Sequence, residues 1–534
     1  MKRILCGWLL LCLALNVAAG EWQWSVRLKG FISKETDKEP VAFLWIPSDC
    51  KQLRAVVMGK HNMSEETLFE KPRFREALAE MGMGMIWITP GIDQQWDVTK
   101  GTQKVFEQMM ADLAEVSGYG ELKNVPVVPI GHSAMATYPW NFAAWNPERT
   151  LAIISLHGDA PRTNLTGYGR ENLEWGRNRN IDGIPGLMIE GEYEWWEARV
   201  NPALAFRMMY PGSCVSFLCD AGRGHFDVAD ETADYIALFL KKAAMLRLPE
   251  EMPMDGKVGL KSINPVDGWL AERWHPNQKK RAKAAPYAQY KGDSHDAFWY
   301  FDQEMAMLTE GRYAETQGKK EQYLSFLQKG KLPRYDENLH VRIQTKFISE
   351  EDGITFHLKA VHTDSLHAEL SEEHADNIPV ISRICGPVEI VNDTTFRVAF
   401  YRMGMDNPRR TGSICLLASS PGDRKYKSAV QQLSLDIPYR NTEGKRQHIL
   451  FPGLPDVNQG TNTLSLDAVT DCGFPVSYYI KEGPAEIKEN KVVFTAIPPR
   501  AKYPVKVTVV AWQYGIAGKV QTAEPVERNF YICR

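Results

Sequence analysis

The feature that most constrains this chain is the stretch 125–136, in which an apolar run ends at a serine. The run leads into Gly131, His132 and Ser133, and residues that favour a helix follow. This order is typical of a strand, a sharp turn and a helix, with the serine hydroxyl at the apex and helix N–H groups behind it. We therefore interpret Ser133 as a nucleophile; the alternative is a hydroxyl that only caps a strand–helix turn.

The segments on both sides of this stretch alternate between apolar runs and helical patterns. Continuous apolar runs, each expected to form a strand, occupy 41–46, 54–58, 85–89, 151–156, 186–190 and 215–218. Helical patterns lie between and after them, most clearly at 103–116 and 231–246. This alternation indicates a mostly parallel sheet that helices cover on both faces. Ligands of such sheets bind at the carboxyl ends of the strands.

An acid and a histidine follow the serine in an informative order. Glu194 stands three residues after Gly191, and His225 follows Gly224 ahead of the last helical pattern of this region. With this order, residues 21 to about 250 resemble the α/β-hydrolase fold. The resemblance implies that neutral His225 takes the Ser133 proton and that the Glu194 carboxylate orients the imidazole.

The resemblance leaves the acid open and has two departures. Glu190, the last residue of the same expected strand, and Glu192, just after it, are alternatives to Glu194, and Glu197 and Asp227 are more distant ones. Met135 occupies the position two places after the nucleophile, where a small residue is usual. Pro129 lies inside the expected strand, where it removes a ladder N–H. Both departures concern the geometry of the turn rather than the identity of the serine.

The oxyanion donors follow only from the resemblance. It implies the backbone N–H of Ala134 and one N–H from the loop that holds Lys60 and His61. Loss of one such donor typically costs about 3 kcal/mol in the barrier. No group of residues has the spacing of metal ligands, so neither a metal nor a cofactor is expected.

Aromatic and cationic residues near the acid and histidine turns are candidates for substrate contacts. Aromatic faces suit sugar rings, and an arginine suits a carboxylate. We name Trp195, Trp196, Arg199 and Arg223 as substrate-binding candidates. For each of them the alternative is structural, a core or rim ring or a solvated charge.

The rest of the chain changes from an irregular segment to a β-rich one. Helices are expected near 295–310 and 319–328, and from about 335 short strands separated by turns indicate one or two β-sandwiches. The last block, within 475–514, resembles immunoglobulin-like modules of secreted bacterial enzymes. We therefore divide the chain into a signal peptide (1–20), an α/β-hydrolase domain with a helical extension at about 250–335 (21–335), a β-sandwich-like domain (336–448) and an immunoglobulin-like domain (449–534).

The N-terminus predicts export. Lys2 and Arg3 precede an apolar run, and Ala18, Ala19 and Gly20 supply small residues for cleavage. We expect a protein of the periplasm or cell surface of a Gram-negative bacterium, with no other membrane span. A net charge of -3 without a long basic run disfavours nucleic acid as a partner. Seven cysteines remain beyond the signal peptide, among which a Cys385–Cys415 bridge is one option.

The whole layout resembles glycan esterases of gut Bacteroidetes, in particular pectin methylesterases of the α/β-hydrolase type with extra β-modules. The resemblance implies removal of methyl esters from galacturonate in pectic oligosaccharides. A glycan acetylesterase is the first alternative. From another class, the alternative is a non-catalytic glycan-binding protein of the cell surface, against which the serine–acid–histidine order argues.

Overall fold

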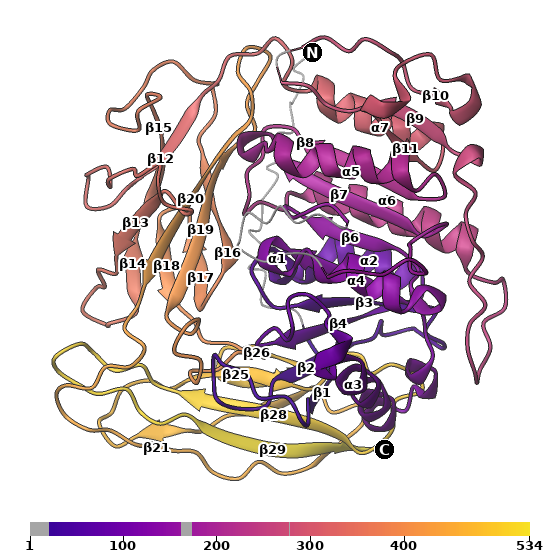
Figure 1. Ribbon diagram of the computed structural model, residues 1–534. Helices are drawn as coiled ribbons and strands as arrows, with labels where there is room; N and C mark the ends of the chain where they lie inside the picture. Colours follow the sequence, from indigo (N-terminus) through magenta and orange to yellow (C-terminus); the bar gives the residue numbers. More distant parts are fainter. Residues whose placement is uncertain (1–20, 162–172, 277) are drawn as a thin grey trace, which may run out of the picture.

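The computed structural model describes residues 21–161, 173–276 and 278–534 (Figure 1). The expected signal peptide, residues 1–20, lies outside this range. In Figure 1 an α/β unit fills the right side, strands β12 to β20 stand to its left, and strands β21 to β29 lie below both. Within the described ranges, no helix is long and apolar enough to cross a bilayer.

The α/β unit is built on one central sheet. Its described strands follow the order β1-β2-β4-β3-β5-β6-β7-β8. The β1–β2 and β2–β4 pairs are antiparallel, and all pairs from β4–β3 onward are parallel. This is the strand order of the α/β-hydrolase fold, as predicted. The strands are β1 (Trp24–Arg27), β2 (Val41–Trp45), β3 (Ala55–Lys60), β4 (Met83–Thr89), β5 (Val127–His132), β6 (Ile153–Leu156), β7 (Pro185–Gly191) and β8 (Cys214–Asp220).

Helices cover this sheet because its strands are apolar on both faces. Every residue of β3 to β8 is buried. The helices are α1 (Ser64–Glu70), α2 (Pro72–Glu80), α3 (Thr102–Ser117), α4 (Tyr138–Trp145), α5 (Glu197–Met209) and α6 (Asp230–Arg247). Helices α3 and α6 begin and end within one residue of the bounds predicted from their periodicity.

A tyrosine compensates for the proline within β5. Pro129 lies opposite Met58 in the parallel β3–β5 pair. There the hydroxyl of Tyr138 accepts the N–H of Ile130 at 3.2 Å and donates to the carbonyl of Met58. The phenol thus bridges two backbone groups where the ladder would otherwise be open. Pro129 is therefore accommodated inside β5, four residues before Ser133.

The segment after α6 forms a small antiparallel sheet rather than a helical extension. Strands β9 (Trp269–Glu272), β10 (Ala285–Pro286) and β11 (Ala297–Tyr300) precede α7 (Gln303–Ala314). The helix predicted at 295–310 is thus a strand followed by a helix. The helix predicted at 319–328 is wrong: β12 (Tyr323–Leu327) occupies it and pairs with β15. Its alternating apolar side chains Leu324 and Phe326 are buried in the core of the β-rich unit.

Two β-rich units follow, each with a four-stranded and a three-stranded sheet among the described residues. In the first, β13-β20-β19-β16 faces β14-β18-β17, and residues of both sheets share one apolar core. Its strands are β13 (Ile343–Lys346), β14 (Thr355–His357), β15 (Lys359–Thr363), β16 (Val380–Cys385), β17 (Val388–Asn392), β18 (Thr395–Val398), β19 (Ser413–Ser420) and β20 (Ala429–Asp436).

The second unit combines β22-β29-β28-β25 with β23-β27-β26. Its core is continuous with the apolar face formed by β1, β2 and α3 of the α/β unit. Its strands are β21 (Ile449–Leu450), β22 (Val457–Asn458), β23 (Thr463–Ser465), β24 (Val469–Thr470), β25 (Ser477–Glu482), β26 (Ala485–Lys488), β27 (Lys491–Phe494), β28 (Val505–Trp512) and β29 (Val526–Cys533).

A buried ionic network fixes the first β-rich unit to helix α1. Arg383 pairs with both Glu66 and Glu70, with a separation of 2.7 Å from Glu70. Arg402 reaches Glu70 at 3.1 Å, and the Tyr401 hydroxyl donates to Glu66 at 3.0 Å. Both carboxylates are almost fully buried. Helix α1 follows the loop that leaves β3, so this network holds the segment that follows the carboxyl end of that strand.

Candidate active site

Ser133 stands on a strained turn between β5 and α4. Its φ is +54°, which is rare for a residue with a side chain and typical of a nucleophile elbow. Gly131 permits the turn, because a Cβ there would lie 2.0 Å from the carbonyl oxygen of Met135. Met135 is accommodated in turn by Gly91, where a Cβ would lie 2.4 Å from the end of the methionine side chain. The glycine at position 91 therefore makes room for the large side chain of Met135, where a small residue is usual.

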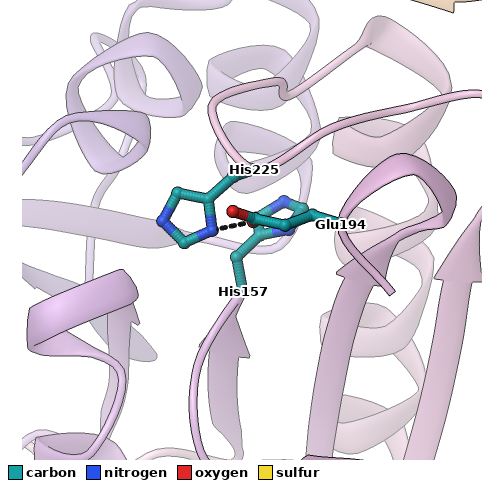
Figure 2. A group of neighbouring side chains, drawn as sticks. All are labelled: His157, Glu194 and His225. Atoms are coloured by element: carbon teal, nitrogen blue, oxygen red, sulfur yellow. Dashed lines mark ion pairs between the residues drawn. The ribbon is translucent and has the colours of Figure 1, made fainter. Parts of the chain in front are cut away.

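The structure brings Ser133, His225 and Glu194 together. His225 Nε2 lies 2.9 Å from Ser133 Oγ, and its Nδ1 contacts a carboxylate oxygen of Glu194 (Figure 2). His225 lies in the loop after β8, and Glu194 lies in the turn after β7. The three residues follow the carboxyl ends of β5, β7 and β8, as expected for this sheet.

The two alternative acids are engaged elsewhere. Glu192 accepts the N–H of Gly222 at 2.8 Å and pairs with Lys427 of the first β-rich unit at 2.9 Å. Glu190 is 1% exposed and lies 3.9 Å from Arg199. Glu194 is therefore the carboxylate of the three that contacts His225.

The loop after β3 leaves one backbone donor for an oxyanion. Lys60 is buried in β3, and its ammonium group donates to the carbonyl of Asp93 at 2.7 Å, over the ring of Tyr138. The N–H of His61 donates to the carbonyl of Ile88 at 2.8 Å, so it is occupied within the sheet. The expectation that Lys60 or His61 supplies the donor thus disagrees with this geometry, because β3 ends at Lys60, two residues further than expected.

Asn62 is the remaining residue of this loop, which joins β3 to α1 (residues 61–63) and is called the oxyanion loop below. The N–H of Met63 is occupied by the Glu65 carboxylate at 3.1 Å. The Asn62 side chain donates to the carbonyl of His132 at 2.9 Å, which fixes the loop beside the nucleophile. On the other side, the N–H of Ala134 belongs to the first turn after Ser133, where N–H groups have no intrahelical acceptor.

Burial sets the protonation of the site. It is the main reason that the pKa of His225 lies well below its ordinary value, with His157, His340 and Arg199 adding repulsion. Burial likewise raises the pKa of Glu194, and the nearby His157 opposes this effect. An imidazole kept neutral is the form that can accept a proton from Ser133.

Of the four substrate-binding candidates, Trp196 is the one open to solvent. Its ring is 41% exposed and lies over the guanidinium of Arg199 at 4.5 Å. Arg199 is 2% exposed and donates to the carbonyl of His157 at 3.1 Å. Arg223 pairs with Asp227 at 3.2 Å, and Trp195 packs edge-on against Trp274. Three of the candidates are therefore already engaged in contacts within the protein.

Two groups of described residues could offer three ligands to a metal ion. In the first, donor atoms of His157, Glu194 and His225 lie within 4.8 Å of one another (Figure 2). There Glu194 already pairs with His225, whose other nitrogen faces Ser133. The second group is Glu272, His275 and Asp296, whose carboxylates pair with Arg281. Contacts within the protein thus already engage Glu194 and His225 of the first group and both carboxylates of the second. Neither group is apparent from sequence spacing.

Comparisons with known proteins give only remote similarities. No protein-family model and no curated protein matches the chain. Among solved structures, it is similar to a hyperthermophilic esterase from the archaeon Pyrobaculum calidifontis, with 15% identity over 42% of this chain and 85% of the other and a TM-score of 0.29.

Two further similar structures have comparable values. A dienelactone hydrolase from Anabaena variabilis has 16% identity over 42% of this chain and 97% of the other, with a TM-score of 0.27. An S-formylglutathione hydrolase from Staphylococcus aureus has 10% identity over 41% and 98%, with a TM-score of 0.29. Similarities this low say nothing of what this chain acts on, and the case for its chemistry depends on the site itself.

Proposed function

We propose that the protein is a serine carboxylic-ester hydrolase. One observation carries this proposal: His225 Nε2 lies 2.9 Å from Ser133 Oγ while its Nδ1 pairs with Glu194. A nucleophile, a base within hydrogen-bond reach and a group that orients the base are the parts that acyl transfer needs. The strained φ of Ser133 supports the same interpretation, because it holds the hydroxyl clear of the sheet.

The reaction follows from these positions. Ser133 Oγ attacks the ester carbonyl and its proton passes to His225 Nε2. The N–H groups of Ala134 and Asn62 donate to the oxygen that becomes negative, and Glu194 stabilises the imidazolium. When the carbonyl re-forms, Nε2 returns the proton to the departing alkoxide, which leaves as the alcohol. Water then repeats the sequence on the acyl-enzyme and releases the acid.

We propose a plant cell-wall glycan as the substrate, with methyl-esterified galacturonate of pectic oligosaccharides as the specific candidate. The exposed ring of Trp196, beside the acid turn and over the Arg199 guanidinium, suits the face of a sugar. The sequence features at residues 1–20 support export, which such a substrate requires. A glycan acetylesterase would use the same triad.

The test is product analysis on methylated and on acetylated pectin. We expect methanol rather than acetate, and no product from Ser133→Ala. Acetate alone would establish the acetylesterase instead. If neither product forms but a fluorophosphonate labels Ser133, the protein is a serine hydrolase of another ester. If Ser133 is not labelled either, the hydrolase proposal fails and glycan binding without catalysis takes its place.

A further inference from the structure

We infer that the first β-rich unit completes the active site and that its His340 is a positioning residue for His225. This inference rests on the proposed ester hydrolysis. His340 lies in the segment between β12 and β13, more than one hundred residues after His225, in a part of the chain that carries no hydrolase pattern.

His340 packs directly against the catalytic imidazole. The ring centroids of His340 and His225 lie 4.7 Å apart at an interplanar angle of 69°. The same ring lies 4.8 Å from that of Phe226, at 72°. Both arrangements are edge-to-face, the favoured geometry for such pairs. His340 therefore contacts the catalytic histidine and its neighbour in the chain.

The other rings around His225 are all buried, whereas His340 is exposed. His132, His157 and Phe226 lie 4.9, 5.6 and 4.6 Å from the His225 ring, with exposed fractions of 0, 1 and 4%. His225 itself is 1% exposed. Among the described aromatic neighbours, His340 is thus the one that separates this imidazole from solvent.

A small apolar cluster holds His340 in place across the domain boundary. Val341 packs, with Met63 of the oxyanion loop, against a cluster that includes Phe226, Cys385 and Cys415. The cluster therefore joins the histidine loop, the oxyanion loop and the sheet of the β-rich unit. Because Val341 is anchored in it, the preceding residue is held over His225.

The position of His340 gives it two effects on His225. Its ring keeps water from the imidazole, which strengthens the hydrogen bonds to Ser133 and Glu194. When protonated, His340 also adds positive potential at His225. The other groups that face His225 are His132 at the end of β5, His157 after β6, Arg199 on α5 and Glu194, whose negative charge acts in the opposite direction. Removal of the ring weakens both effects, and both changes raise the pKa of His225.

The experiment compares His340→Ala, His340→Phe and wild type in the full chain. The readouts are the rate of Ser133 labelling by a fluorophosphonate and kcat/KM for p-nitrophenyl acetate, each between pH 4.5 and 9. For His340→Ala we expect a roughly tenfold lower kcat/KM. In its pH–rate profile, the fall of kcat/KM on the acidic side should move to higher pH. Phenylalanine keeps the ring, so His340→Phe should recover most of the rate.

His357→Ala is the matched control, because His357 is an exposed histidine of the same unit that contacts Glu350 and Thr395. It should match wild type in rate and pH profile. The inference is overturned if wild type is active and His340→Ala keeps its rate and acidic limb. A general loss of folding would lower the fraction of labelled protein without moving the limb. If wild type itself is neither labelled nor active, the proposed function fails instead.

Discussion

The carboxylate of Glu65 accepts the backbone N–H of His132 at 2.6 Å and so joins helix α1 to the last residue before the nucleophile. Its other oxygen accepts the N–H of Met63 at 3.1 Å. One buried side chain thus fixes the oxyanion loop and the start of the elbow relative to each other. Burial raises the pKa of Glu65 to about 7, chiefly through desolvation, although these N–H groups oppose the shift.

Glu65→Gln tests this arrangement through stability. A folded-state pKa raised to about 7 from 4.5 means that the wild type loses stability as pH rises from 4.5 to about 7, by about 3 kcal/mol. The amide does not ionise, so the variant should lack this loss. Denaturant titrations at pH 5 and pH 8 measure the difference. Glu148→Gln, at an exposed side chain, is the control, and an unchanged gap between the two pH values in Glu65→Gln would contradict the prediction.

The identity of the triad acid is tested by three substitutions. Glu194→Gln should lower kcat by on the order of 10⁴-fold, because the imidazole loses its orienting charge. Glu192→Gln should leave kcat close to wild type but lower the free energy of unfolding, because it breaks the buried pair with Lys427. Glu190→Gln should also spare kcat. Steady-state kinetics on a p-nitrophenyl ester distinguish the three; a near-normal Glu194→Gln would reassign the acid.

The nucleophile makes a separate prediction. Ser133→Ala should lower kcat by on the order of 10⁶-fold while the fold is kept, since alanine only removes the hydroxyl. Circular dichroism checks the fold and single-turnover kinetics check the rate. Turnover close to wild type would show that another residue attacks the ester.

Burial of His225 predicts the pH dependence of activity. Because desolvation lowers its pKa below the ordinary 6.5, the neutral base persists below that pH. The acidic limb of kcat/KM should therefore have its midpoint below pH 6.5. A pH–rate profile with an uncharged ester measures it, and a midpoint above pH 7 would show that His225 is protonated more easily than its burial implies.

The buried ionic network between helix α1 and the first β-rich unit can be tested by its effect on stability. Arg383→Met leaves Glu66 and Glu70 buried with less compensation, which typically costs about 3–5 kcal/mol. Arg73→Met, which breaks an exposed pair with Asp234, should cost at most about 1 kcal/mol. Urea unfolding of both variants gives the comparison. Equal effects would mean that the buried network contributes no more than a surface pair.

Secondary structure that is determined by residues close together in the sequence could be predicted from the sequence. Apolar runs and helical periods are local, so the sheet and helices α3 and α6 were correctly predicted. The segment 319–328 was wrongly predicted as a helix, because the pairing partner of β12 that favours a strand lies in β15, more than thirty residues later. Only the tertiary structure provides that partner.

The active site likewise has features that the sequence reveals and contacts that only the structure reveals. The order of Ser133, Glu194 and His225 was visible, and the structure brings these three together. Contacts between distant segments were not visible: Glu65 on the N–H of His132 and His340 on the ring of His225 carry no sequence signal. Whether an arginine faces solvent also depends on its tertiary neighbours, which is why Arg199 could be proposed as a substrate contact.

The bridge between Trp22 and Gly483 joins the beginning of the described chain to its last domain. Nearby, Ser25 of the sheet edge donates to Glu482, a residue 457 positions later, at 2.6 Å. The ribosome thus makes β1, and β2 beside it, long before it makes the last domain that contacts this edge. Strand β1 can pair with β2 early, but its contacts with the last domain form only after nearly all of the described chain has been synthesised. This edge of the sheet is therefore completed late, and removal of the last domain would take away these contacts while the β1–β2 pairing remains.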